Sequence, residues 1–316
     1  MTPGLKRLFY NASDGVIDLP GNFPKIPNVI APHKIPEETI PVFINQVLPR
    51  LEIDTFTVGR LQPKSEVTYS DIGTIYAKDI VGKLYSHPLY ALSSVNQGYM
   101  WNQCRPLIAH FGTQEKPTYL QVRFLHDLYD FSAVNITSVQ DSTTVLSILN
   151  VAYNGGDKYP NIDKIKDSTI LATDLRLRFE ASGDVSNVTF SIIDEEQNTV
   201  CLKSGSIGCT IKLPYINWSG TKGYWNIGGE ENKKWIDYVI YSGNKCNFNF
   251  AEMQESVLGL YLSMFTSDKP KLVNTTIQVD TDKEYVSLSY ENMQVKALKK
   301  AGDEFRIKND YEIKTR

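Results

Sequence analysis

The sequence predicts a mainly all-β protein: a large antiparallel β-sandwich with one N-terminal helix and an extended proline-rich strap. Residues 174–180 read Asp-Leu-Arg-Leu-Arg-Phe-Glu and alternate strictly between apolar and charged side chains, as a half-buried strand requires. Segments with the same period recur along the chain, and clusters of Gly, Asn, Asp and Ser separate them. Many short strands without long helices between them favour an antiparallel sandwich over a parallel sheet.

The first 54 residues are expected to form the strap and the helix. Prolines recur at positions 20, 24, 27, 32 and 36, which favours extended geometry and excludes a regular helix there. Residues 36–51 then begin with a proline and two acids and carry apolar residues at helical spacing, which predicts one amphipathic helix. Residues 55–316 are expected to form the sandwich domain.

Further strands are predicted at residues 145–153, 188–193, 210–213, 234–241, 275–279, 285–290 and 293–298. Residues 251–264 leave two alternatives. They fit a weak helix, but Gly259 and the alternation of Leu258, Leu260 and Leu262 fit a strand equally well.

The tryptophans also leave alternatives. Trp218 and Trp225 lie in a stretch rich in Gly and Asn, where they either form an exposed platform for sugars or point inward at the end of the sandwich. The inward position is the commoner one for large aromatic residues. Trp235 alternates with Asp237 and Val239, so we expect it in the core or at a sheet interface.

Composition excludes several classes of function. Net charge is -3, from 33 Lys and Arg against 36 Asp and Glu, so no basic field is present to hold nucleic acid. No run of eighteen apolar residues predicts a membrane-spanning helix, and we expect no membrane partner. At 316 residues the chain is long enough to bury a core without disulfides or metals.

Motifs that would assign a cofactor or a reaction are missing from the sequence. The four cysteines form no C-x-x-C pair, so no zinc site is predicted; Cys201 and Cys209 are either free thiols or partners across a hairpin. The chain contains no G-x-S-x-G, H-E-x-x-H, G-x-x-x-x-G-K-[ST] or G-x-G-x-x-G. We therefore predict neither a cofactor nor a metal.

The segment between Gly98 and Arg178 interleaves aromatic, amide, histidine and arginine residues. A strand near residues 119–126 would place Tyr119, Gln121 and Arg123 on one face. In one interpretation this segment is a cleft wall, where Trp101 or Tyr99 stacks on a sugar and Arg105 or Arg123 pairs with a carboxylate or sulfate. In the other, it is a sheet surface covered by another part of the chain.

Residues 101–111, 119–129 and 167–179 resemble the C-terminal β-sandwich portion of heparinase-like and alginate-lyase-like bacterial polysaccharide lyases. The resemblance spans about residues 55–279 and rests on strand patterns. In those families an α/α toroid precedes the sandwich, and a uronic acid polymer lies between the two. This chain has no predicted toroid, so the resemblance implies that a separate helical domain or chain would supply it.

The resemblance also implies roles for particular residues. His110 and Tyr99 would be catalytic, because β-elimination needs a base near the C5 proton. Substrate binding would fall to other side chains, which stack on the sugar or neutralise the uronate carboxylate. These are Trp101, Asn102, Arg105 and Arg123.

Three functions follow from these observations. The first is a lyase-like β-sandwich that binds acidic polysaccharide but lacks the helical catalytic toroid. The second is a non-catalytic structural or protein-interaction β-sandwich. The third is a glycosidase or lyase that is complete within the sandwich. Clustering of Trp101, Arg105, His110 and Arg123 on one concave surface would favour the first or third, and their dispersal into the core the second.

Overall fold

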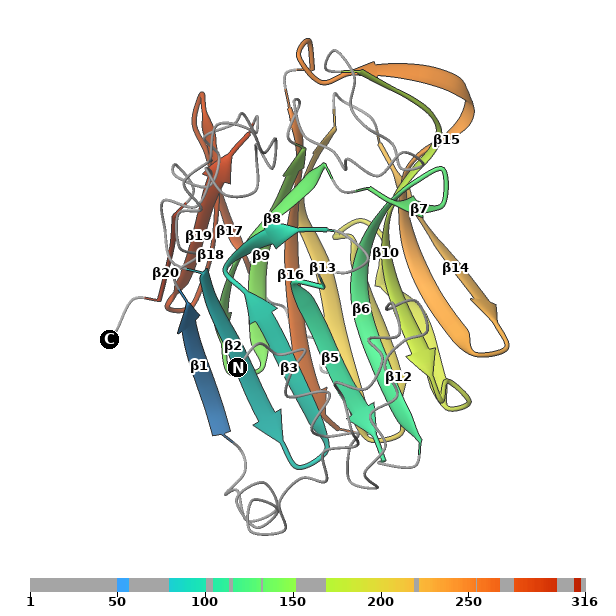
Figure 1. The fold of residues 1–316 in the computed structure, drawn as a ribbon, viewed down its shortest axis with the longest axis vertical. Helices are drawn as coiled ribbons and strands as arrows, with labels where there is room; N and C mark the ends of the chain where they lie inside the picture. Colours follow the sequence, from blue (N-terminus) through green and yellow to red (C-terminus); the bar gives the residue numbers. More distant parts are fainter. Residues whose placement is uncertain are drawn as a thin grey trace, which may run out of the picture.

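The computed structural model describes residues 50–56, 80–100, 105–113, 116–131, 133–151, 169–218, 222–253, 255–267, 276–299 and 310–313. Within these ranges the chain forms strands and turns but no helix, and its paired strands are antiparallel, which confirms the predicted all-β class. The described residues therefore include no helix with the length and apolar character needed to cross a membrane. Figure 1 shows two large sheets face to face and a smaller third sheet beside them.

The strap and residues 36–49 of the predicted helix lie outside the described residues. Arg50 and Leu51, the last residues of that predicted helix, instead begin strand β1, which pairs with β2. Because β1 spans residues 50–56, it runs across the expected domain boundary between residues 54 and 55.

Sheet A has the strand order β1-β2-β3-β5-β6-β10-β15-β14, and the short strand β7 pairs with β6. The long strand β10 contains the alternating residues 174–180 and lies between β6 and β15, although both are distant in sequence. The bounds of the strands are β1 Arg50–Phe56, β2 Ile80–His87, β3 Tyr90–Val95, β5 Leu107–Gly112, β6 Pro117–His126, β7 Tyr129–Asp130, β10 Thr169–Gly183, β14 Tyr224–Glu230 and β15 Lys233–Asn249.

Sheet B has the order β11-β12-β13-β16-β9-β8-β4. Its central strand is β16. Residues 251–264, for which the sequence left a weak helix and a strand as alternatives, form this strand from Ser256 onward. The bounds are β4 Gln97–Tyr99, β8 Val134–Asp141, β9 Thr144–Val151, β11 Val188–Asp194, β12 Thr199–Ser204, β13 Ile207–Trp218 and β16 Ser256–Thr266.

The third sheet has the order β17-β18-β19-β20 and packs on the outer face of sheet B. Leu288 and Val295 of this sheet are fully buried against Leu146 and Tyr261 of sheet B. The arrangement is therefore a sandwich with a third layer (Figure 1). The bounds are β17 Gln278–Thr281, β18 Tyr285–Tyr290, β19 Met293–Leu298 and β20 Asp310–Ile313.

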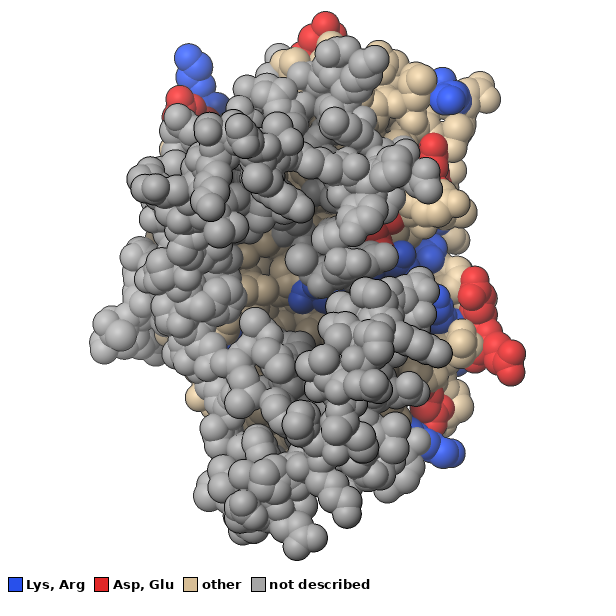
Figure 2. Space-filling view, in the orientation of Figure 1, with Lys and Arg blue, Asp and Glu red and all other residues tan. Residues whose placement is uncertain are grey.

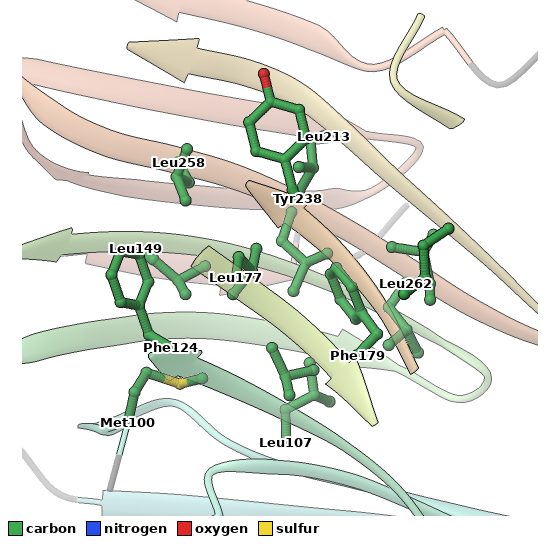
Figure 3. Packing of buried hydrophobic residues seen from close by; sticks show 14 of the residues in the cluster. Met100, Leu107, Phe124, Leu149, Leu177, Phe179, Leu213, Tyr238, Leu258 and Leu262 are labelled. Carbon is green, nitrogen blue, oxygen red and sulfur yellow. The ribbon is translucent and has the colours of Figure 1, made fainter. Parts of the chain in front are cut away.

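The main core fills the space between sheets A and B. Leu175, Leu177 and Phe179 all point into it with no exposed surface, which confirms the inward face predicted for residues 174–180. Figure 3 shows Leu177 and Phe179 among apolar side chains of both sheets. Burying each such side chain stabilises the fold by about 1.5–3 kcal/mol.

The tryptophans divide between the two sides of the sheets. Trp218 and Trp225 are buried in the main core, as the inward alternative predicts. Trp235 lies instead on the outer face of sheet A, where it pairs with Glu180 and is half-buried. Its indole ring lies over Gly228, and the Arg178 guanidinium stacks 4.2 Å from the ring centroid. The alternation in the sequence correctly placed Trp235 and Asp237 on the same face of β15. That face is the outer one, whereas Ile236 and Tyr238 face the core.

Cys201 and Cys209 are buried free thiols. Cys209 pairs with Leu202 and Cys201 with Thr210, so the two thiols lie on opposite faces of sheet B. The alternative in which Cys201 and Cys209 face each other across a hairpin is therefore wrong. Burial raises the pKa of the Cys209 thiol well above its ordinary value.

Candidate functional site

The outer face of sheet A, which points away from the main core, is unusually rich in charged side chains. The pairing register places Gln121, Glu180 and Trp235 in one row across β6, β10 and β15. Arg123, Arg178 and Asp237 form the next row. Two arginines opposite each other on neighbouring strands repel, so this face is stable only if carboxylates separate them.

Arginines and carboxylates alternate along this face in a continuous series of ion pairs, which we call the arginine ladder. Asp130 is shared by Arg105 and Arg123, each of which binds both of its oxygens at 2.9–3.3 Å. Arg123 also reaches Glu180 at 2.7 Å. The members of the ladder are, in order, Arg105, Asp130, Arg123, Glu180, Arg178, Asp237, Arg176 and Asp174.

The other end of the ladder is equally well paired. Asp237 accepts hydrogen bonds from Arg178 at 2.8 and 2.9 Å and from Arg176 at 2.8 Å. Arg176 also binds Asp174. Arginine and carboxylate charges therefore cancel along the ladder.

The carboxylates of the ladder lie deeper than the guanidinium groups. The side chain of Asp237 has no exposed surface and that of Glu180 is 3% exposed, whereas the side chain of Arg123 is 17% exposed. Figure 2 shows lysine and arginine atoms in a band over β6 and β10 on this face. Burial by itself would lower the pKa of Arg123, but the adjacent Asp130 and Glu180 raise it above its ordinary value, so the group stays cationic.

The structure brings three of the predicted site residues onto this face. Arg105 donates from Nε to Gln121 Oε1 at 2.9 Å, which places its side chain beside Arg123. His110 pairs with Tyr119 on β6, and the two rings meet edge to face at 5.0 Å between centroids. In an unbroken strand Arg105 and His110, five residues apart, would lie on opposite faces, but β5 begins only at Leu107, so Arg105 precedes the strand and its side chain reaches the same face as His110.

The other predicted residues are not joined to this group. Trp101 and Asn102 lie outside the described residues. Tyr99 belongs to β4 of sheet B, where its backbone pairs with Asn135, and its side chain is outside the described part.

The carboxylates Asp130, Glu180 and Asp237 were missed as members of this site. A partial signal was present, since alternation in residues 174–180 puts Arg176, Arg178 and Glu180 on one face. Nothing local in the sequence indicates that Asp130 and Asp237 come to lie beside them.

The ladder ends at an open hollow of about 420 Å³, lined by Asp127, Leu128, Thr173, Asp174, Arg176, Ser242 and Gly243. Asp127 and Leu128 form the turn between β6 and β7, and both have left-handed backbone angles, with φ of 47° and 73°. Asp127 Oδ1 holds this turn by accepting hydrogen bonds of 2.8 Å from Thr173 N, Thr173 Oγ1 and Asp174 N.

No protein-family model, curated protein or solved structure matches this chain. The ladder and the hollow must therefore be interpreted from their own geometry.

The chemistry of the ladder is mutual neutralisation. Each arginine of the ladder is bound to carboxylates of the same chain, and each carboxylate is bound to arginine. Such a network stabilises the face when complete, and loss of one member leaves an uncompensated buried charge. Within the described ranges, no group of three or more His, Cys, Asp or Glu residues is arranged to hold a metal ion.

Proposed function

We propose that this chain is a non-catalytic β-sandwich that acts as a structural or protein-interaction module through the outer face of sheet A. The observation that carries the proposal is the binding of both Arg105 and Arg123 to Asp130. A uronate or sulfate group would have to compete with this internal carboxylate. Displacing Asp130, whose side chain is only 8% exposed, would leave a buried charge without its partners.

The composition of the face suits contact with another protein. Interfaces are enriched in arginine and aromatic residues, and the ladder combines several arginines with Trp235 stacked on Arg178. Because the ion pairs already hold these side chains in place, little side-chain entropy is lost when a partner binds.

Acidic polysaccharide is the second candidate ligand. Arg105, His110 and Arg123 lie on one face of sheet A, as a lyase-like sandwich would need, and this observation favours it. In that case a separate helical domain or chain would complete the site, and His110 would be the base for β-elimination.

The test is an ultraviolet lyase assay and an affinity assay on heparin, chondroitin, hyaluronan, alginate and pectin. We expect the wild-type chain neither to bind these polymers nor to produce absorbance from unsaturated uronate. Asp130→Asn should bind heparin more strongly, because it removes the carboxylate that Arg105 and Arg123 share, although Arg123 keeps its ion pair with Glu180. Glu230→Gln is the matched control, since it makes the same change in charge at an exposed position on β14.

Two results would overturn the proposal. Wild-type binding that is lost in Arg105→Ala would establish the polysaccharide as the ligand. Absorbance that appears with the wild type and disappears in His110→Ala would make the chain an enzyme. If Asp130→Asn and Glu230→Gln bind heparin equally, the ladder does not control access to its arginines.

A further inference from the structure

We propose that β14, the last strand of sheet A, pairs with β14 of a second copy of this chain, so that two sandwiches share one continuous sheet. β14 spans Tyr224–Glu230, and within the described residues its one hydrogen-bonded neighbour is β15. Figure 1 shows it at the margin of the sheet. The proposal uses the edge of sheet A rather than its outer face, so it is independent of the proposed function.

The free edge of β14 is suited to receive another strand. Alternate residues of an antiparallel strand direct their N–H and C=O groups to opposite sides, so those that point away from β15 form a row of donors and acceptors. The pairing of β14 with β15 is regular over all 7 residues, so no bulge turns this edge away. The strand contains no proline or lysine, and its one charged residue, Glu230, lies at its end.

The other sheet edges in the described part of the chain each carry a feature that hinders strand addition. Strand β4 has 3 residues, and β17 and β20 have 4 each. Strand β1 has charged residues at alternate positions, Arg50, Glu52 and Asp54. The register of β11 with β12 shifts between Ile192 and Asp194. Short length, charges and bulges are the usual protection of an edge, and β14 has none of them along its middle.

Apolar side chains are exposed beside this edge. Ile227 lies on the inward face of β14, because it pairs with Ile236 of the main core, yet it is 48% exposed. Strand β11 is the edge of sheet B on the same side of the sandwich. Its Ile192 pairs with the core residue Val200 and is still 40% exposed. A second copy that extends sheet A at β14 would cover this apolar opening, which favours association.

The sequence of β14 is complementary to itself, which selects a second copy as the partner. With a twofold axis at Ile227, all 7 residues pair and Ile227 meets its own copy. Trp225 then faces Gly229, which has no side chain to obstruct the indole ring. Tyr224 faces Glu230, and its hydroxyl donates to a carboxylate at the exposed rim. Any other antiparallel register leaves residues of β14 unpaired.

This pairing has a consequence for the charged face of sheet A. A twofold axis that relates two antiparallel edge strands in one sheet is perpendicular to that sheet, so both outer faces lie on the same side. The two arginine ladders would therefore belong to one continuous surface. A partner that carries two copies of its binding motif would bind such a surface more tightly than it binds one chain.

The test is the mass of the full chain by size-exclusion chromatography with multi-angle light scattering at several protein concentrations. We expect twice the 35.7 kDa of one chain. Ile227→Lys places two ammonium groups opposite each other at the axis, so the dissociation constant should rise about tenfold or more. Leu89→Lys is the matched control and should leave the dimer intact. Leu89 is 46% exposed and lies in the turn between β2 and β3, away from β14.

A mixing experiment tests the register itself. Ile227→Glu should also weaken the dimer when it is alone, but an equimolar mixture of Ile227→Lys and Ile227→Glu should recover the dimer mass, because position 227 faces position 227. Circular dichroism checks that each variant is folded.

The inference is overturned by a wild type that is monomeric at every concentration, or by an Ile227→Lys variant that dimerises as well as the wild type. Equal loss of the dimer in Leu89→Lys would also overturn it, as would a mixture that stays monomeric. These outcomes leave the proposed function intact, because that function is decided by the polysaccharide assays.

Discussion

Asp237 neutralises two arginines of the ladder at once. It lies on the outer face of sheet A with no exposed area, yet it neutralises both Arg176 and Arg178. A buried carboxylate in this position is tolerated because its oxygens are saturated by guanidinium donors. Asp237 therefore stabilises the fold only while Arg176 and Arg178 are bound to it.

Replacing Asp237 by asparagine should lower the free energy of unfolding by about 3–5 kcal/mol, because Arg176 and Arg178, whose side chains are mostly buried, lose their shared counter-charge. Urea denaturation followed by tryptophan fluorescence measures this loss. Glu230→Gln removes one negative charge from an exposed position and should change the free energy by no more than about 0.5 kcal/mol. Equal effects of the two substitutions would show that the ladder contributes nothing specific.

Asp127 gives a prediction on pH. Burial would raise the pKa of this carboxyl group, but the hydrogen bonds from Thr173 and Asp174 and the nearby His126 outweigh it and hold the pKa below its ordinary value of 3.8. A lowered folded-state pKa means that Asp127 stabilises the protein above pH 3.8 and that this contribution is lost as pH falls through the folded-state pKa.

The unfolding free energies of wild type and Asp127→Asn should therefore differ at neutral pH and converge in acid. Urea denaturation of both proteins between pH 7 and pH 2 is the measurement. A difference that stays constant over this range would show that the charge of Asp127 does not stabilise the turn.

At the scale of the element, β10 combines the main core and the charged face in one strand. Leu175, Leu177 and Phe179 point inward while Arg176 and Arg178 point outward, because successive side chains alternate. The strand ends at Gly183, whose φ of +96° is strained for other residues. A Cβ there would also lie closer than 3.0 Å to the carbonyl oxygen of Pro117.

Gly183→Ala should consequently lower the free energy of unfolding by about 3 kcal/mol, from backbone strain and the clash together. Gly205 also has a positive φ, +57°, but a Cβ at that position would meet nothing within 4 Å. Gly205→Ala should therefore cost only about 1 kcal/mol. Thermal or urea denaturation of the two variants side by side separates the clash from the strain; equal losses would mean that the Pro117 contact adds nothing.

At the scale of the whole molecule, the third sheet is joined to sheet B by an apolar cluster and by a polar clamp. Glu255 binds Lys299 Nζ at 2.9 Å through Oε1, and it accepts hydrogen bonds from Tyr215 and Asn217 through Oε2. Asn150 Nδ2 donates to Leu298 O at 2.7 Å beside it. The clamp lies at the end of β19.

The clamp should weaken in alkali. Burial and the hydrogen bond to Glu255 raise the pKa of Tyr215 to about 12. A raised folded-state pKa means that this stabilisation is complete below pH 10 and is lost as pH rises toward about 12. The free energy of unfolding should fall less steeply over this range in Tyr215→Phe than in the wild type, as urea denaturation at several pH values would measure. If the free energy of unfolding falls equally steeply with pH in both proteins, the Tyr215–Glu255 hydrogen bond does not stabilise the fold.

The local features of the fold are readable from the sequence because they depend on one segment at a time. Residues 285–290 and 293–298 were predicted as strands with the bounds that the structure has, and the inward face of β10 followed from its alternation. Residues 251–264 stayed ambiguous because their apolar pattern fits both periods.

The neighbours of each strand were decided only by the tertiary structure. The ladder needs β10 between β6 and β15, and it needs Asp130 and Asp237 from separate parts of the chain. Side-chain alternation is a property of one strand, whereas strand order depends on hydrogen bonds and core packing between distant segments. For that reason Arg105 and Arg123 read in sequence as candidate anion-binding residues, and in the folded chain they are held by a carboxylate of their own.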